Sequence, residues 1–212
     1  MFLRIFITIF VFLSLDMHAN YKNSDGRELN KSFRELLEWQ RNNKDPKISY
    51  IDLSNEWQDI DFKKADNYFV WVGHSTFLIK KNGITILTDP IFSDRASPFK
   101  NIGPKRLIPP ALNINDIPSI DYVTISHNHY DHLDINSLIQ ISEQYPSAIF
   151  LVPAGDLKLL KRKGINNVLE FDWWESVEYE NVTFTFTPVQ HWSKRGLFDR
   201  NKSLWGGWFM NF

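Results

Sequence analysis

Three histidines and two aspartates lie within eight residues, in the segment 127–134. The segment follows an apolar, β-branched run at 120–125, a composition typical of a buried strand. It precedes a predicted helix that begins at Ile135. Open α/β sheets bind ligands in loops at the carboxyl ends of their strands. The histidine-rich segment therefore lies where a binding site is expected.

These residue types indicate metal binding, because imidazole and carboxylate groups are good ligands for zinc and similar divalent ions. His127 and His129 are two positions apart and can face one ion, while Asp131 and His132 leave the turn toward a neighbouring position. Asp134 is a candidate acceptor for the second N–H of a ligating histidine. A surface loop rich in histidine by chance is disfavoured, because three of the six histidines of the chain lie here.

Three further candidates stand at predicted strand ends. His191 follows the alternating strand at 182–187 and is predicted to complete a three-histidine site with His127 and His129. Asp89 ends the strand at 84–88, and either a turn-forming role or a role beside the metal ligands is open. His74 follows a glycine between two strands, and for it a structural and an active-site role are equally open.

The segment 91–118 is rich in proline and lacks periodic apolar residues. Long irregular loops of this kind are usually functional. Its basic residues Arg95, Lys105 and Arg106 are candidates for contact with a phosphate group, with solvated surface charge as the alternative.

The composition of the 212 residues, 43% hydrophobic and 23% charged, indicates one globular domain or slightly more. A net charge of −1 gives no electrostatic reason to expect a nucleic acid partner. The absence of cysteine excludes a disulfide framework, a cysteine-containing zinc site and a cysteine nucleophile.

Residues 1–19 carry one positive charge followed by an apolar run that suits a signal peptide, with a retained membrane anchor as the alternative. The chain is therefore expected to be exported, periplasmic or membrane-associated. Residues 20–67 are predicted to be an amino-terminal extension, in which 20–28 are polar and flexible and 47–67 are extended. Residues 68–212 are predicted to form the main domain. Strands are predicted at 68–72, 76–80, 84–88, 120–125, 148–152, 168–171, 182–187 and from Leu204 onward, and helices at 29–41, 135–145 and 156–163.

The segment His127 to His132 matches the HxHxDH signature of the metallo-β-lactamase superfamily. Within it, the chain resembles the N-acylphosphatidylethanolamine-hydrolysing phospholipase D family over residues 68–208. The matching segments are 71–74, 88–92, 95–98, 103–106, 125–134, 172–175, 190–192 and 204–206.

This resemblance implies an α/β (α+β) fold, the αββα sandwich, with two zinc ions at one edge. It implies that His127, His129 and His191 hold the first ion, and that Asp131 and His132 help to hold the second and act in catalysis. The family also uses an aspartate and a histidine further along the chain, which this sequence lacks. One zinc ion is therefore the alternative to two. The family's sandwich has two similar halves, of which this chain supplies one and the first strands of the other, so the sandwich is expected to be incomplete.

The resemblance further implies hydrolysis of N-acylphosphatidylethanolamine to an N-acylethanolamine and phosphatidic acid. Asp131 would orient the attacking hydroxide. The expected partners are a phospholipid substrate and a membrane surface, with a homodimer left open. Two alternatives stand beside this function. One is another hydrolase of the same fold acting on a lactone or a soluble phosphodiester, and the other is an inactive remnant.

Overall fold

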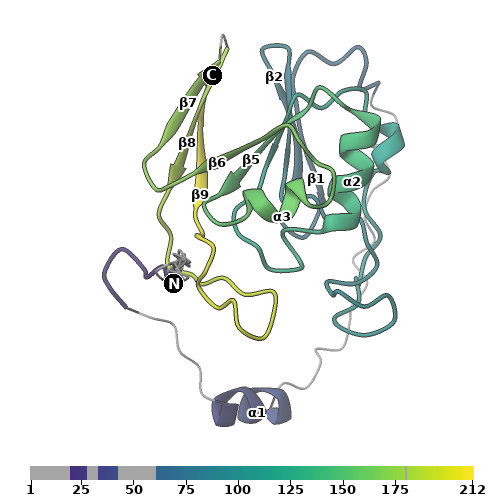
Figure 1. Cartoon of the computed structure of the whole chain (residues 1–212). Coiled ribbons are helices and arrows are strands. Elements are labelled where there is room, and N and C mark those ends of the chain that lie inside the picture. Colours follow the sequence, from purple (N-terminus) through teal and green to yellow (C-terminus); the bar gives the residue numbers. More distant parts are fainter. Residues whose placement is uncertain (1–19, 28–32, 43–60, 180) are drawn as a thin grey trace, which may run out of the picture.

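The computed structural model describes residues 20–27, 33–42, 61–179 and 181–212 (Figure 1). The predicted signal peptide and most of the predicted extended segment lie outside these residues. Helix α1 (Phe33–Asn42) falls at the carboxyl end of the helix predicted in the extension. Within the described ranges, no helix has the length and hydropathy that crossing a membrane requires.

The larger sheet has six strands in chain order among the described residues. Its first three strands are antiparallel and the remaining pairs are parallel. Asn82 and Gly83 join the second and third strands with φ angles of 52° and 81°, which the turns of tight hairpins require. The strands are β1 (Tyr68–Gly73), β2 (Thr76–Lys81), β3 (Ile84–Thr88), β4 (Tyr122–Thr124), β5 (Ile149–Pro153) and β6 (Val168–Phe171).

The smaller sheet has three antiparallel strands, β7 (Ser176–Tyr179), β8 (Val182–Thr187) and β9 (Gly207–Asn211). The alternating sequence of β8 buries Val182, Phe184 and Phe186, as predicted for a half-buried strand. The sequence did not predict β7, because its four residues include a charged Glu178 and none of them is fully buried.

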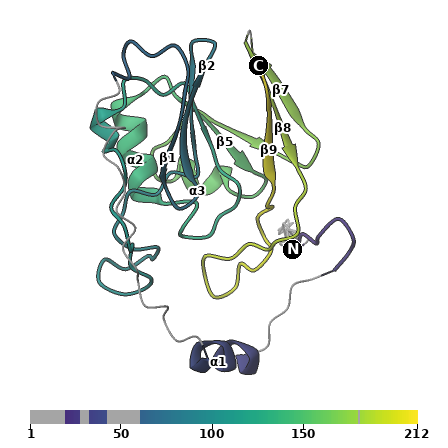
Figure 2. The ribbon, with the colours of Figure 1, turned by 180° about the vertical axis from the view of Figure 1, so that it is seen from behind.

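The two sheets pack face to face, and helices cover the outer face of the larger sheet (Figures 1 and 2). Between the sheets, Ile86 and Leu151 of the larger one meet Phe184 and Phe186 of the smaller one. Each such buried side chain contributes roughly 1.5–3 kcal/mol of hydrophobic stabilisation. The helices on the outer face are α2 (Ile135–Gln144), α3 (Leu157–Lys161) and the short 3₁₀ helix η2 (Ile114–Asp116).

The parallel strands place the candidate residues at one edge of the larger sheet. Because β3 and β4 run in the same direction, the residues that follow them, Asp89 and the segment from Ser126, emerge side by side. The backbone of Asp89 confirms this, since its N–H donates to the carbonyl of Thr124 at 2.8 Å.

The amino-terminal segment 20–27 corrects one prediction, because part of it is packed. Asn23 is 4% exposed, and its Oδ1 accepts hydrogen bonds from the backbone N–H of His191 and from Nε1 of Trp205, both at 2.9 Å. The backbone N–H of Tyr21 donates to the carbonyl of Asn201. Buried N–H groups require acceptors, and this polar segment supplies one to His191 and to Trp205.

Candidate metal centre

His127, His129 and His191 form the first cluster, with one ligand atom from each within 4.8 Å of the others. Nε2 of His191 lies 3.0 Å from Nε2 of His127 and 3.3 Å from Nδ1 of His129. A neutral imidazole carries a single N–H, so three nitrogens that converge in this way compete for few protons. A divalent ion among them would accept all three lone pairs, so the residues fit a metal.

Burial and mutual repulsion keep these histidines neutral. Burial lowers the pKa of His127 well below its usual range, and the neighbouring histidines lower it further. Burial and His191 lower the pKa of His129 to about 4. Burial and His132 likewise lower the pKa of His191. At neutral pH all three imidazoles therefore offer lone pairs to a cation.

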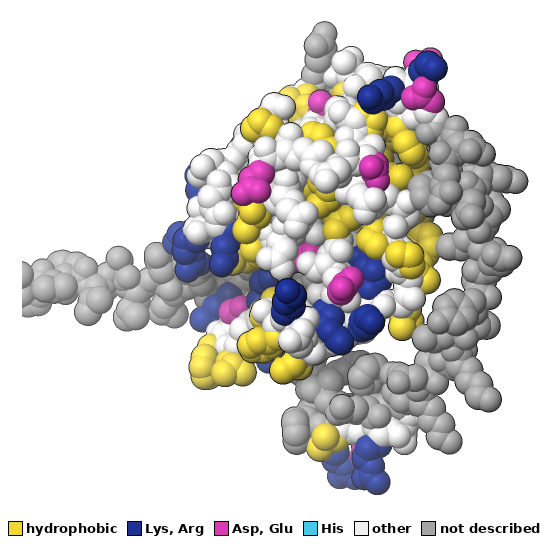
Figure 3. Space-filling model, turned by 90° about the vertical axis from the view of Figure 1, so that its right-hand side faces the viewer, with side chains coloured by type: hydrophobic (Ala, Val, Ile, Leu, Met, Phe, Trp, Pro, Cys, Tyr) yellow, Lys and Arg dark blue, Asp and Glu magenta, His cyan; other side chains and the backbone are white. Residues whose placement is uncertain are grey.

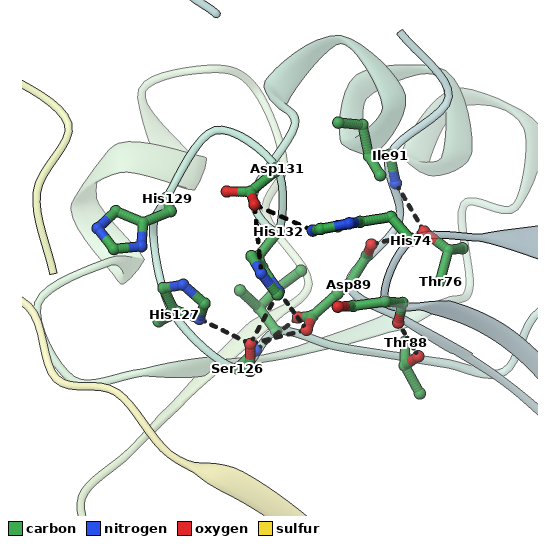
Figure 4. A network of polar contacts seen from close by, with 12 residues as sticks. His74, Thr76, Thr88, Asp89, Ile91, Ser126, His127, His129, Asp131 and His132 are labelled. Atoms are coloured by element: carbon green, nitrogen blue, oxygen red, sulfur yellow. Dashed lines mark hydrogen bonds and ion pairs between the residues drawn. The ribbon is translucent and has the colours of Figure 1, made fainter. Parts of the chain in front are cut away.

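His74, Asp131 and His132 form a second cluster beside the first. Oδ2 of Asp131 lies 2.9 Å from Nε2 of His74 and 3.6 Å from Nε2 of His132 (Figure 4). His74 comes from the turn between β1 and β2 and has a positive φ of 52°. The structure thus brings His74, whose role the sequence left open, into a set of three possible metal ligands.

Asp89 connects the two clusters through Ser126 (Figure 4). Its carboxylate accepts hydrogen bonds from the backbone N–H of Ser126 at 2.6 Å, from Oγ of Ser126 at 2.7 Å and from Nδ1 of His132 at 2.8 Å. Because Oγ of Ser126 donates to Asp89, it accepts from Nδ1 of His127, 2.9 Å away. Both histidines are therefore protonated at Nδ1, which leaves the Nε2 lone pairs facing the clusters.

His132 differs from His127, His129 and His191 in the direction in which its pKa is shifted. Burial alone would lower its pKa, but the hydrogen bond and charge of Asp89, together with Asp131, raise it above the ordinary value. The backbone of Asp89 itself has a positive φ of 36°, and Oγ1 of Thr76 donates to its carbonyl at 2.8 Å. Neighbouring side chains therefore hold an unusual backbone conformation that aims the carboxylate at His132.

The expectation that Asp134 accepts a hydrogen bond from a ligating histidine is not met. Its carboxylate accepts from the hydroxyl of Ser137 at 2.6 Å and from the backbone N–H groups of Asn136 and Ser93. Asp134 is the N-cap of α2, a position that favours aspartate because the first N–H groups of a helix lack partners.

A cavity of about 800 Å³ opens beside the second cluster. Lys105 and Arg106 line it, whereas Arg95 lies outside it and donates from Nη1 to the carbonyl of Gly103 at 2.6 Å. Arg106 donates to the carbonyl of Ile91, and burial lowers its pKa, although it stays positively charged. The cavity walls include Ile91, Leu107 and Trp192, so it combines an apolar lining with two basic groups.

Two residues that position the site were missed in the sequence. Asn23 holds the backbone of His191, as described above. Nη1 of Arg195 donates to the carbonyls of Asn128 and Leu133, at 2.8 and 2.7 Å, and thereby brackets the histidine loop. These contacts join residues more than 60 positions apart, and no local pattern marks them.

Residues 85–211 match the family described as the beta-lactamase superfamily domain. The chain is 39% identical over 158 residues to N-acyl-phosphatidylethanolamine-hydrolyzing phospholipase D 1 of Caenorhabditis elegans, covering 70% of this chain and 44% of the relative. It is 41% identical over 146 residues to the mitochondrial N-acyl-phosphatidylethanolamine-hydrolyzing phospholipase D of Saccharomyces cerevisiae, covering 67% of this chain and 31% of the relative. The chain thus spans less than half the length of either relative.

Among solved structures, the fold is similar to that of a metallo hydrolase from the archaeon Ignicoccus hospitalis. The TM-score is 0.50 with 20% sequence identity, over 68% of this chain and 55% of the other. This likeness concerns the fold, and it agrees with the two-sheet sandwich that the family resemblance implies.

Proposed function

Because this chain belongs to the beta-lactamase superfamily, we propose that it is a metal-dependent hydrolase that uses zinc and cleaves a phosphodiester bond. The observation that carries the proposal is the distribution of histidine. All five histidines of the described residues lie in the two adjacent clusters, with Asp131 between His74 and His132. Histidines with structural roles have no reason to lie together in the fold, whereas histidines that bind one metal ion must lie around it.

The roles of the residues follow from their positions. His127, His129 and His191 would hold one ion, and His74, Asp131 and His132 the other. Such ions would supply a water of lowered pKa and a Lewis acid for the phosphoryl oxygen. The second oxygen of Asp131 would orient the attacking water by accepting its hydrogen bond.

The cavity supports a phospholipid as the substrate. Lys105 and Arg106 would bind the anionic phosphate, and the walls formed by Ile91, Leu107 and Trp192 would accept acyl chains. The relatives in worm and yeast are named for hydrolysis of N-acylphosphatidylethanolamine. We therefore propose that this lipid is cleaved to an N-acylethanolamine and phosphatidic acid.

The test combines metal content with product release. The purified chain would be analysed for zinc per chain by mass spectrometry and assayed on N-acylphosphatidylethanolamine in detergent micelles, a lactone and a soluble phosphodiester. We expect bound zinc and release of phosphatidic acid, and in His127→Ala we expect the loss of about one zinc ion per chain and of product release. Asn166→Ala, an exposed position remote from the clusters, is the matched control and should change neither.

Each other outcome contradicts a defined part of the proposal. Hydrolysis of only the lactone or the soluble phosphodiester would replace the lipid by that substrate. Bound zinc without hydrolysis of any of them would support the inactive alternative. Full activity in His127→Ala would overturn the metal centre itself.

A further inference from the structure

Two loops with exposed apolar side chains border the cavity. The hairpin loop, residues 93–107, supplies Lys105, Arg106 and Leu107 to its wall. The tip loop, residues 193–203, begins directly after Trp192, which also lines the cavity. Figures 1 and 2 show both loops at the same end of the molecule, the hairpin loop in teal and the tip loop in yellow.

The tip loop carries the two most exposed large apolar side chains of the described residues, and the hairpin loop carries three more exposed ones. In the tip loop, Leu197 is 83% exposed and Phe198 is 86% exposed. In the hairpin loop, Phe99, Ile102 and Leu107 are between 61% and 68% exposed. Exposed apolar side chains that gather at one end of a protein usually mark an interaction site.

Both loops are held in place by bonds at their bases, so their ends are presented to solvent. In the hairpin loop, the backbone N–H of Ala96 donates to the carbonyl of Pro104, and the backbone N–H of Arg106 donates to the backbone carbonyl of Asp94. In the tip loop, the backbone N–H of Asn201 donates to the carbonyl of Ser193 at 2.9 Å. Nearer the end of this loop, the carboxylate of Asp199 accepts from the backbone N–H of Gly196 at 2.7 Å, directly before Leu197.

Basic residues surround the apolar ends. The two loops together contain eight Lys and Arg and two Asp, whereas the whole chain has 24 Lys and Arg against 25 Asp and Glu. Lys100, Lys105 and Lys202 are exposed. Figure 3 shows Lys and Arg side chains beside hydrophobic ones at this lower end of the molecule. Apolar groups that enter acyl chains, next to cations that meet anionic headgroups, are typical of a membrane-surface contact.

We propose that the hairpin loop and the tip loop form a docking surface for a bilayer that contains anionic phospholipid. Leu197 and Phe198 enter the acyl region, and Lys100 and Lys202 contact the headgroups. This inference rests on the proposed function for its choice of a phospholipid partner. The docking surface would place the opening of the cavity against the bilayer, so that a lipid can pass from the bilayer into the cavity.

The chain contains no cysteine, so a single introduced thiol can carry an environment-sensitive fluorophore. The fluorophore would be attached to Phe198→Cys and, as the control, to Phe209→Cys on β9, which is 61% exposed. Each full chain would be mixed with vesicles of equal parts phosphatidylcholine and phosphatidylglycerol. We expect a blue-shifted emission that rises several-fold at position 198 and no change at position 209. This local readout is independent of any membrane contact made by residues 1–19.

A second measurement tests the two components of the surface separately. Leu197→Ser with Phe198→Ser should weaken the partition of the chain onto these vesicles by roughly tenfold or more, while Phe209→Ser should leave it unchanged. Lys100→Glu with Lys202→Glu should weaken it several-fold on the anionic mixture and not on pure phosphatidylcholine.

The docking surface would be overturned if the fluorophore at position 198 stayed in water while the chain sedimented with vesicles, or if the chain did not bind them. Hydrolysis of the lipid in detergent micelles would then continue, and the proposed function would stand. If the fluorophore entered the bilayer but the chain had no hydrolytic activity, the docking surface would stand and the proposed function would be contradicted.

Discussion

Oδ2 of Asp89 lies 2.8 Å from Nδ1 of His132, which joins the end of β3 to the histidine loop that follows β4. Because the carboxylate accepts a hydrogen bond from Nδ1–H, the Nε2 lone pair of His132 faces His74 and Asp131. A residue that touches no ion can in this way decide how well an ion is held.

Asp89→Asn should therefore weaken metal binding while keeping the ligands. The amide offers a neutral acceptor in place of a carboxylate, and loss of such a partner lowers metal affinity by about 10- to 100-fold. Competition with a chromogenic chelator measures the affinity, with the exposed Asp66→Asn as the control. Equal affinities of Asp89→Asn and the parent would contradict the role given to Asp89.

His74→Ala should lower the zinc content by about one ion per chain, because three ligands are then reduced to two at the second cluster. His191→Ala should remove the other ion by the same reasoning. Mass spectrometry of the folded protein counts the ions. If His74→Ala kept its full zinc content, His74 would be a residue beside the site and not a ligand.

Asn23→Ala should destabilise the fold by about 1–3 kcal/mol, because the backbone N–H of His191 would lose its acceptor, while Nε1 of Trp205 would keep only the carbonyl of Val189 at 3.1 Å. Urea unfolding measures the change in the free energy of unfolding. Asn166→Ala is the exposed control. A loss no larger than that of the control would mean that water replaces the side chain.

Asp156 makes the stability depend on pH in a direction opposite to that of most carboxyl groups. Burial raises its pKa from 3.8 to about 7, although Ser203 and Asn128 donate hydrogen bonds to it. The folded state therefore holds the proton more tightly than the unfolded state does. This contribution is fully present below the unfolded value of 3.8 and is lost as the pH rises toward about 7.

Asp156→Asn should remove this dependence. The difference in unfolding free energy between variant and parent should grow in favour of the variant as the pH rises from about 4 to about 7. Urea titrations with a chelator present measure it, and the metal ligands, common to both proteins, cancel. A difference that is constant with pH would contradict the raised pKa.

The sequence predicted those parts of the fold and of the site that local patterns determine. The alternation in β8, the Asn82–Gly83 turn and the run before Ser126 each depend on neighbouring residues, and the structure has the corresponding elements. The neighbourhood of His127, His129 and Asp131 follows from their spacing in one loop.

Apart from the approach of His191 to His127 and His129, which its position after a predicted strand indicated, long-range contacts could not be predicted in this way. His74 reaches Asp131 across 57 positions, and Asn23 reaches His191 across 168. Neither residue lies in a pattern that reveals its partner. Asp134 was given the wrong partner for a related reason, since an aspartate directly before a helix is suited both to capping and to accepting from a histidine.

Arg195 lies within the tip loop, and its guanidinium stacks over the ring of Tyr130 at 4.1 Å while it holds the histidine loop. Loop and metal centre therefore share one rigid skeleton. If the tip loop docks as proposed, its length sets the height of the metal centre above the bilayer. A tip loop shorter by one residue would then bring the metal centre closer to the bilayer by the same distance for every substrate, whatever the length of its acyl chains.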